Sequence, residues 1–271
     1  MNFIPLIQKC LGIRGTHLVK SLFFPNQLQI DKNGRKFTVN SKRDYLFWLR
    51  VKKGKWEPET FVIFDKFLSR QNSFIDVGAW LGATVLYGCQ LAKHCYAVEP
   101  DPIAFEELKK NVELNKDMIS RITLANVALS NLSGTMNLYQ PEGEWGNSGS
   151  SILFDETKAS KEVRSTTFQQ FITDHSIDDC NFIKMDIEGG EFIVLPTMID
   201  YLKTHKPTLL LELHPMYIKS PPQQLEEMIT VFNIYDHIYD ENLKEIDLES
   251  IFFSMKNKPD KTLRIVLTSL S

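Results

Sequence analysis

From Ser73 onward the sequence alternates short apolar runs with longer segments of helical periodicity, and this alternation limits the fold more than any other feature. The runs expected to form buried strands are residues 74–77, 95–98, 122–124, 182–185, 208–211 and 263–267. Helices are expected over residues 59–69, 81–91, 102–114 and 191–202. Because strands that alternate with helices form parallel sheets covered on both faces, the sequence predicts an α/β fold.

Length and composition agree with one α/β domain and an appendage, since the chain has 271 residues, of which 43% are hydrophobic. A formal net charge of -3 offers no general attraction for nucleic acid, so no nucleic-acid partner is expected. The scattered cysteines suit free thiols in a reducing, cytoplasmic setting. No apolar run approaches the roughly 18–20 residues that span a bilayer, and no secretory cleavage site is evident.

The first 58 residues are expected to form an N-terminal extension, a helical arm followed by a hairpin, and residues 59–271 the main domain. In the hairpin, strands at 28–31 and 35–39 flank Asn33-Gly34, a pair that favours tight turns.

The arm, residues 1–24, carries basic residues and no acidic one, and two interpretations are open. As a basic amphipathic segment it would make a peripheral membrane contact or bind an acidic partner. Alternatively it packs on its own domain or on the second subunit of a homodimer. Gly12 and Gly15 interrupt the helical period and favour the second interpretation.

The segment Asp76-Val-Gly-Ala-Trp-Leu-Gly82 ends a strand, turns at two glycines and enters a helix. Glycine lets backbone approach a ligand where a Cβ would collide. The pattern is neither the dinucleotide fingerprint nor a phosphate-binding P-loop. About twenty residues later Glu99 ends the next strand, where a carboxylate can hold ribose hydroxyls; the alternative for Glu99 is to favour the start of the following helix. Together these features predict a nucleoside site.

With further motifs, this segment resembles the FkbM family of class I S-adenosylmethionine-dependent methyltransferases. The matching motifs, in family order, are Asp76-Val-Gly-Ala-Trp-Leu-Gly82, Val98-Glu-Pro-Asp-Pro102, Leu108-Lys-Lys-Asn-Val-Glu-Leu-Asn115, Asn126-Val-Ala-Leu-Ser130 and Phe182-Ile-Lys-Met-Asp-Ile-Glu-Gly-Gly-Glu191. The resemblance covers residues 59–215 and implies a Rossmann-like sheet of seven mostly parallel strands. Trp80 stands where the family usually has a small polar residue, and we expect it to reshape the pocket wall.

The resemblance implies S-adenosylmethionine as the cofactor and suggests which residues hold it. Those residues are Asp76, Gly78, Ala79 and Gly82 for the methionine and ribose side, Glu99 for the ribose, Asn126 and Ala128 for adenine, and Glu59 for the methionine ammonium group. The alternative for Glu59 is a solvated acid at a helix start.

A hydroxyl acceptor must be positioned in line with the methyl group and must lose a proton to a base. Asp186 and Glu188 follow the strand at 182–185, and His214 follows the neighbouring strand. Histidine titrates near neutral pH, so we predict that these three residues orient and deprotonate the acceptor. The alternatives are helix capping by Asp186 or Glu188 and a turn role for His214.

Lys184 and Glu212 are expected on the acceptor side. The segment 140–151, rich in glycine and serine, predicts a lid; in it, Trp145 would stack on a sugar ring and Ser148 would contact the substrate. The alternative is a surface loop in which Trp145 has no such role. No metal is predicted, although Asp186, Glu188 and Glu212 are an alternative set of oxygen ligands.

The sequence therefore predicts an S-adenosylmethionine-dependent O-methyltransferase whose acceptor is a sugar hydroxyl of a glycan or glycolipid. One alternative is a non-catalytic module that docks a partner through its basic arm. A nicotinamide-dependent sugar epimerase or reductase is disfavoured because no tyrosine is followed by lysine four residues later.

Overall fold

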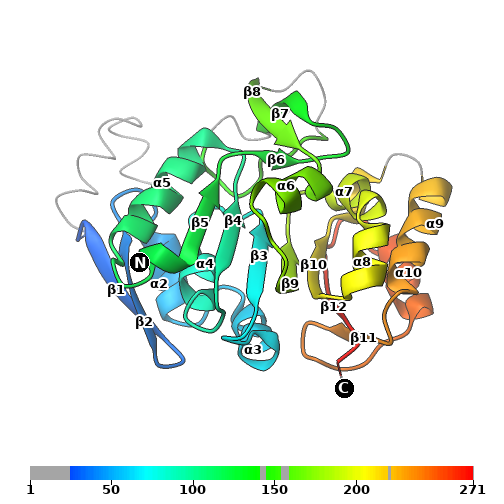
Figure 1. The fold of residues 1–271 in the computed structure, drawn as a ribbon, viewed down its shortest axis with the longest axis horizontal. Coiled ribbons are helices and arrows are strands. Elements are labelled where there is room, and N and C mark those ends of the chain that lie inside the picture. Colours follow the sequence, from blue (N-terminus) through cyan, green and yellow to red (C-terminus); the bar gives the residue numbers. More distant parts are fainter. Residues whose placement is uncertain (1–24, 141–144, 154–158, 219–220, 271) are drawn as a thin grey trace.

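The computed structural model describes residues 25–140, 145–153, 159–218 and 221–270. Its central sheet contains, from edge to edge, β11 (His237–Asp240), β12 (Leu263–Thr268), β10 (Thr208–Leu213), β9 (Cys180–Met185), β3 (Ser73–Val77), β4 (Cys95–Val98) and β5 (Ile122–Ala125). Strands β10, β9, β3, β4 and β5 pair in parallel, and only β12 runs antiparallel to both its neighbours. This confirms the predicted α/β sheet of seven mostly parallel strands (Figure 1).

Helices cover both faces of this sheet because its central strands are apolar on both sides. In β3, every residue is buried; Ile75 faces one core cluster and Phe74 the other. The first cluster is closed by α6 (Phe168–Asp174), α7 (Glu191–Thr197), α8 (Ile199–His205), α9 (Pro221–Phe232) and α10 (Leu248–Asn257). The second is closed by α3 (Pro58–Phe67), α4 (Ala83–Gly88) and α5 (Pro102–Glu113).

The predicted hairpin is present as β1 (Gln27–Lys32) and β2 (Arg35–Asn40), and α2 (Tyr45–Lys52) follows it. It packs on the main domain, since Ile30 and Phe37 share the second core cluster. Asn115, just after α5 (Pro102–Glu113), also accepts a hydrogen bond from the backbone N–H of Thr38 at 2.8 Å. The arm predicted over residues 1–24, with its membrane or subunit contact, lies outside the described residues.

Two local predictions were wrong. The helix expected over residues 191–202 is broken at Met198 into α7 and α8, and Pro196, which has no N–H to donate, lies in the last turn of α7. A second sheet was missed: β6 (Ala128–Leu129), β8 (Ala159–Thr166) and β7 (Gly134–Gln140), in that order. Most residues of β7 and β8 are exposed or half-buried, so these strands lack the apolar runs that revealed the central sheet.

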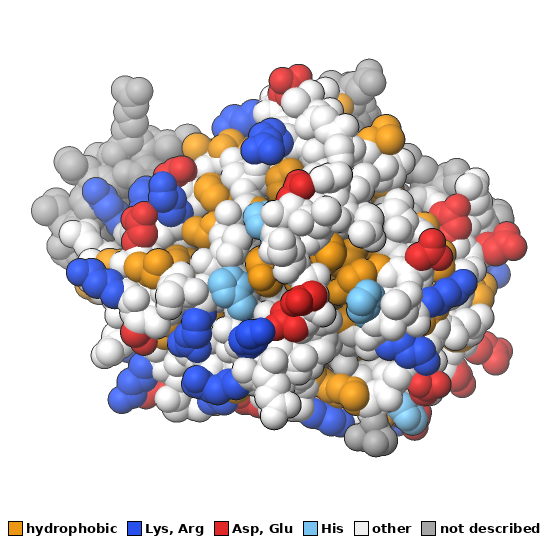
Figure 2. All heavy atoms as spheres, in the orientation of Figure 1, with side chains coloured by type: hydrophobic (Ala, Val, Ile, Leu, Met, Phe, Trp, Pro, Cys, Tyr) orange, Lys and Arg blue, Asp and Glu red, His pale blue; other side chains and the backbone are white. Residues whose placement is uncertain are grey.

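Among the described residues, no helix is long and apolar enough to cross a bilayer. Cys89, Cys95 and Cys180 are buried free thiols, as expected, whereas Cys10 lies outside the described part of the chain. The face in Figure 2 carries both signs of charge, in line with the small net charge.

Candidate active site

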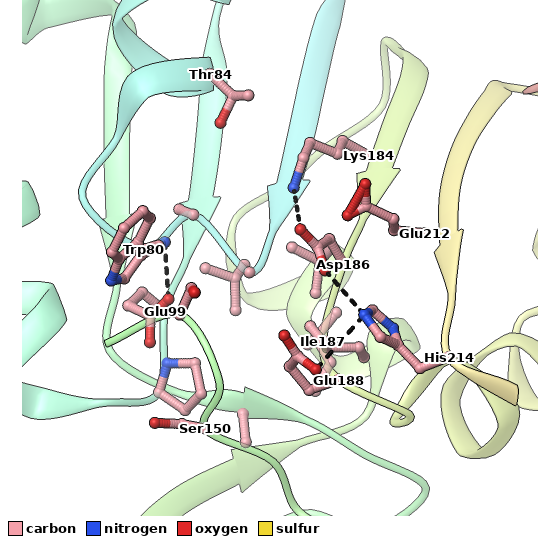
Figure 3. Close-up of a pocket in the computed structure, with 18 of the residues that line it drawn as sticks. Trp80, Thr84, Glu99, Ser150, Lys184, Asp186, Ile187, Glu188, Glu212 and His214 are labelled. Carbon is pink, nitrogen blue, oxygen red and sulfur yellow. Dashed lines mark hydrogen bonds and ion pairs between the residues drawn. The ribbon is translucent and has the colours of Figure 1, made fainter. Parts of the chain in front are cut away.

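A pocket opens at the carboxyl ends of the parallel strands, the usual ligand position in such sheets. Counting its mouth, it encloses about 1140 Å³ of empty space. The residues that line it and matter below are Glu57, Gly78, Ala79, Trp80, Thr84, Glu99, Ala128, Asn147, Ser148, Ser150, Lys184, Asp186, Glu188, Glu212 and His214 (Figure 3). The sequence therefore located the pocket correctly, and most of the predicted site residues lie around it.

Each of the two glycines after β3 lets another part of the chain come close to its Cα atom. Gly78 has φ +85°, and a Cβ there would lie 1.8 Å from the carbonyl oxygen of Asp186. Gly78 lines the pocket, but only glycine fits at this position mainly because the turns after β3 and β9 are in contact there. Gly82, at φ +87°, lets α4 approach Leu108 of α5, whose Cδ1 would be 2.5 Å from an added Cβ. Gly82 does not line the pocket, so its role is helix packing rather than cofactor contact.

Glu99 points into the turn that follows β3. Its Oε2 accepts a hydrogen bond from the backbone N–H of Trp80 and its Oε1 from that of Asp101, both at 2.8 Å. The side chain is 6% exposed, and burial raises the pKa of Glu99 to about 8. Asp101, not Glu99, is the N-cap of α5, with hydrogen bonds from Ile103 and Ala104. A carboxylate on the pocket wall thus keeps lone pairs for a ligand.

Lys184 is a buried cation between two carboxylates. Its Nζ lies 3.6 Å from Oδ1 of Asp76 and 3.5 Å from Oδ2 of Asp186. Asp76 is fully buried and does not line the pocket; burial raises its pKa, an effect that the nearby Lys184 opposes. Asp76 is therefore placed beneath the pocket as a counterion, not against the cofactor as the sequence suggested.

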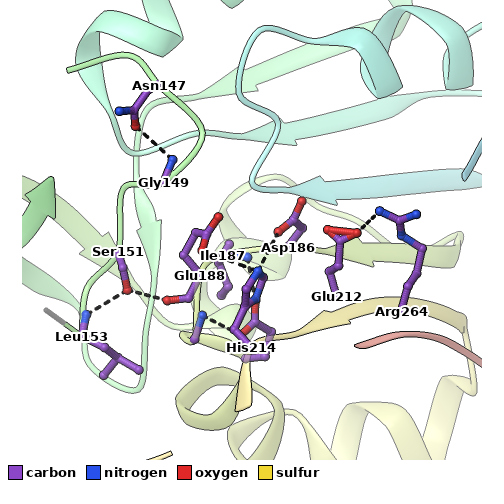
Figure 4. Close-up of polar contacts among 12 residues, drawn as sticks. Asn147, Gly149, Ser151, Leu153, Asp186, Ile187, Glu188, Glu212, His214 and Arg264 are labelled. Atoms are coloured by element: carbon purple, nitrogen blue, oxygen red, sulfur yellow. Dashed lines mark hydrogen bonds and ion pairs between the residues drawn. The ribbon is translucent and has the colours of Figure 1, made fainter. Parts of the chain in front are cut away.

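His214 lies among three carboxylates (Figure 4). Its Nε2 is 3.5 Å from Oε2 of Glu188 and 3.9 Å from Oδ1 of Asp186, and its Nδ1 is 3.3 Å from Oε1 of Glu191. Burial alone would lower the pKa of His214, but the hydrogen bond to Glu191 and the three negative charges raise it to about 9. At neutral pH the imidazole is therefore protonated, so of the two predicted tasks, orienting and deprotonating the acceptor, His214 suits the first.

Glu188 has the pKa that suits a base. Burial raises it to about 7, partly offset by the charge of His214. The residue has φ +52°, a left-handed conformation that non-glycine residues adopt rarely and often at functional sites. Neither it nor Asp186 caps α7, whose N-cap is Gly190 with no side-chain hydrogen bond.

The turn that carries Glu188 is held by a residue that the sequence argument did not assign. The carboxylate of Glu191 accepts hydrogen bonds from the backbone N–H groups of Ile187 at 2.7 Å and Gly189 at 2.8 Å. Glu191 is buried, belongs to α7, and also contacts His214. It thus positions both candidate proton-transfer groups at once.

An ion-pair chain forms the remaining wall. Arg264 of β12 lies 3.3 Å from Oε1 of Glu57 and also pairs with Glu212. Burial, together with Asp186 and Glu57, raises the pKa of Glu212 to about 8. Glu57, the N-cap residue of α3, lines the pocket, whereas the predicted Glu59 does not and lies 4.0 Å from Arg264. Pro58, at the first helical position, was the signal that marks Glu57 as the cap.

The comparison with protein families decides the classification. The model described as "Methyltransferase FkbM domain" matches residues 76–239, more than half of the chain. The chain belongs to the FkbM methyltransferase family. The motif resemblance found in the sequence is thereby confirmed.

Solved structures to which this member of the family is similar include two methyltransferases of low sequence identity. An FkbM methyltransferase from Methylobacillus flagellatus KT is 18% identical, with 83% of this chain and 55% of that chain covered and a TM-score of 0.46. The chain thus spans about half the length of that protein. A putative methyltransferase from Streptococcus mutans in complex with SAH is 11% identical, with 78% and 96% covered and a TM-score of 0.41. No curated protein matches the chain.

Two further predicted residues of the FkbM domain lie outside the pocket wall. Asn126 donates through Nδ2 to the carbonyl of Glu99 at 2.8 Å, so it supports the segment after β4. The ring of Trp145 lies 4.3 Å from Nζ of Lys161 instead of facing the pocket. Ala128 and Ser148 do line the pocket, as expected. Residues 141–144 of the predicted lid lie outside the described residues.

Among the described residues, two sets of side chains have possible ligand atoms within 4.8 Å of one another, close enough to hold a metal ion. They are Asp186, Glu191 and His214, and Glu57, Asp186 and Glu212. The alternative ligand set considered from the sequence, with Glu188, is not one of them. In each set a basic side chain of the chain itself, His214 or Arg264, already pairs with the carboxylates.

The carboxylates of this site make the stability of the domain dependent on pH. The pKa values of Glu188 (about 7), Glu99 (about 8), Glu212 (about 8) and His214 (about 9) are all raised. A raised pKa stabilises the fold below the unfolded value, and this stabilisation disappears as pH rises through the folded value. We expect the melting temperature of the ligand-free protein to fall by about 5–10 °C between pH 6 and 9.

Scanning calorimetry at several pH values measures this fall. The Glu99→Gln protein is the comparison, because it lacks one of the titrating groups and its melting temperature should depend less on pH. A melting temperature that stays constant or rises from pH 6 to 9 would contradict the assignment.

Proposed function

We propose that the chain transfers a methyl group from S-adenosylmethionine to a sugar hydroxyl of a glycan or glycolipid. The observation that carries the proposal is the position of Glu99, which accepts a hydrogen bond from the turn after β3 and lines an open pocket beside it. Ribose hydroxyls are hydrogen-bond donors, and a carboxylate at the end of the second strand is the group that accepts them in Rossmann-like sheets.

The charge of the pocket supports the same cofactor. The acidic residues on its wall are Glu57, Glu99, Asp186, Glu188 and Glu212, against the basic residues Lys184 and His214. Burial keeps Glu99 and Glu212, with pKa values of about 8, largely protonated at neutral pH, and a bound sulfonium or ammonium group would favour their ionised forms.

The acceptor side supplies the proton transfer. When bound, S-adenosylmethionine would supply an electrophilic methyl carbon, with its sulfur as the leaving group. Glu188, with a pKa near 7, accepts the proton of the acceptor hydroxyl. The His214 imidazolium, 3.5 Å from Glu188, holds that carboxylate in place. Asp186 pairs with Lys184 and His214, and, although burial would raise its pKa, these cations keep it low enough for the group to stay ionised.

Calorimetric titration with S-adenosylhomocysteine tests the cofactor part. The protein should bind it, and the Glu99→Gln variant should bind it about 10- to 100-fold more weakly, since one of the two oxygens available to the ribose hydroxyls is replaced by an NH₂ group. Glu113→Gln, on the exposed side of α5, is the matched control and should bind as the wild type does. Binding that is unchanged by Glu99→Gln would contradict the proposed ribose site.

Melting temperatures of the wild-type protein with different ligands distinguish the proposed function from its alternatives. A rise in melting temperature with NAD but not with S-adenosylhomocysteine would favour a nicotinamide enzyme, because a ligand of the native state stabilises it. No response to either would favour a non-catalytic module. Labelled methyl donor offered with a panel of saccharides then tests the acceptor class.

A further inference from the structure

Gly146 bonds the loop 145–151 to two residues on the cofactor side of the pocket. Its N–H donates to Oδ2 of Asp101 at 2.6 Å, and its carbonyl accepts a hydrogen bond from Nε1 of Trp80 at 2.9 Å. Ser150 also donates to Oδ2 of Asp101, at 3.3 Å. Beyond Gly146, Asn147, Ser148 and Ser150 of this loop line the pocket.

The same two residues hold the carboxylate of Glu99. The backbone N–H of Trp80 donates to one oxygen of Glu99 and that of Asp101 to the other. Four residues, Glu99, Trp80, Gly146 and Asp101, therefore form a closed ring of hydrogen bonds. Each member has two partners within the ring, so a shift of the Glu99 carboxylate displaces both groups that hold the loop.

We propose that this ring makes the loop 145–151 a lid that senses the cofactor, with Trp80 and Asp101 as its positioning residues. The inference rests on the proposed function, in which ribose hydroxyls bind Glu99. Ribose hydrogen bonds fix the orientation of the Glu99 carboxylate. The backbone of Trp80 and Asp101 is fixed in turn, and with it the indole and carboxylate that bind Gly146.

The far end of the lid reaches the proposed base. The Oγ of Ser151 donates to the carbonyl of Glu188 at 2.5 Å (Figure 4). When the lid is held in one conformation, this bond also holds the backbone of Glu188, the residue proposed to accept the proton of the substrate. This predicts that the cofactor binds first and that the acceptor site is complete only afterwards.

Asp101 allows the ring to be broken without unfolding α5, because its two oxygens have separate roles. Oδ1 accepts a hydrogen bond from the N–H of Ile103 at 2.8 Å as the helix cap, and Oδ2 serves the loop. In Asp101→Asn the amide oxygen retains the cap, and the NH₂ group replaces the acceptor of Gly146. Trp80→Phe removes the other bond and keeps an aromatic ring against Phe47.

Hydrogen exchange of the amides in 145–153, with and without S-adenosylhomocysteine, tests the inference. In the wild type the ligand should slow exchange there by about tenfold or more. Asp101→Asn should bind the ligand within about threefold of the wild type in calorimetry, and both Asp101→Asn and Trp80→Phe, when saturated with ligand, should show less than about twofold slowing. Asp247→Asn, the equivalent cap of α10 with no loop partner, is the control and should behave as the wild type.

Several outcomes would overturn the inference. The first is that ligand slows hydrogen exchange of the loop in Asp101→Asn as much as in the wild type. The second is that the wild type binds the ligand without any slowing. The third is that Asp101→Asn no longer binds the ligand, which would place Asp101 in the cofactor site itself. If the wild type does not bind the ligand, the proposed function fails. The hydrogen-bonded ring is then tested by comparing loop exchange in the ligand-free wild type and Asp101→Asn proteins. Faster loop exchange in Asp101→Asn than in the wild type then supports the ring, and equal exchange contradicts it.

Discussion

The Gly78→Ala protein is expected to lose more than about 3 kcal/mol of stability, and its cofactor binding with it. The added Cβ would lie 1.8 Å from the carbonyl oxygen of Asp186 and 2.9 Å from its carbonyl carbon. These are backbone atoms, so no side-chain rotation relieves the clash. The turns after β3 and β9 would have to separate, although the N–H of Asp186 donates to Val77 at 3.0 Å.

The Gly34→Ala control measures the cost of a positive φ in the absence of a steric clash. Gly34 has φ +78°, similar to the +85° of Gly78, but an added Cβ there meets nothing within 4 Å. We expect this control to cost only about 1–2 kcal/mol, the price of a left-handed alanine. Urea unfolding followed by circular dichroism measures both variants. Equal losses would show that the contact between the turns has no special weight.

The second large effect is expected for Glu188→Gln, which should lower kcat by about 10²- to 10⁴-fold. Glutamine has a similar shape but cannot accept the proton of the acceptor hydroxyl. Affinity for S-adenosylhomocysteine should change little, since Glu188 lies on the acceptor side. The assay is turnover of labelled S-adenosylmethionine with the most active saccharide of the panel.

The pH profile distinguishes a base from a residue that only shapes the pocket. In the wild type, kcat/KM should rise with pH through about 7 as Glu188 ionises and fall above about 9 as His214 loses its proton. The variant should lack the lower limb. Glu113→Gln is again the control and should have the wild-type profile. A Glu188→Gln protein with full activity would assign the proton transfer to another group.

The central sheet and the position of the pocket were predictable from the sequence alone. Buried parallel strands leave continuous apolar runs, as in β3 and β9, and these runs are visible without knowledge of their partners. The carboxyl ends of parallel strands lie at one edge, so residues that directly follow different strands must meet there. Glu99, Asp186, Glu188, Glu212 and His214 were found for this reason.

Only the tertiary structure decided what each of these groups does. The proton on His214 depends on carboxylates from the turn after β9 and from α7, and the charges of Glu57 and Glu212 depend on Arg264, fifty or more residues away in sequence. Desolvation and charge pairing act through space, so the sequence named the titratable groups and could not assign their pKa values. Likewise, the clash at Gly78 exists only because two turns meet.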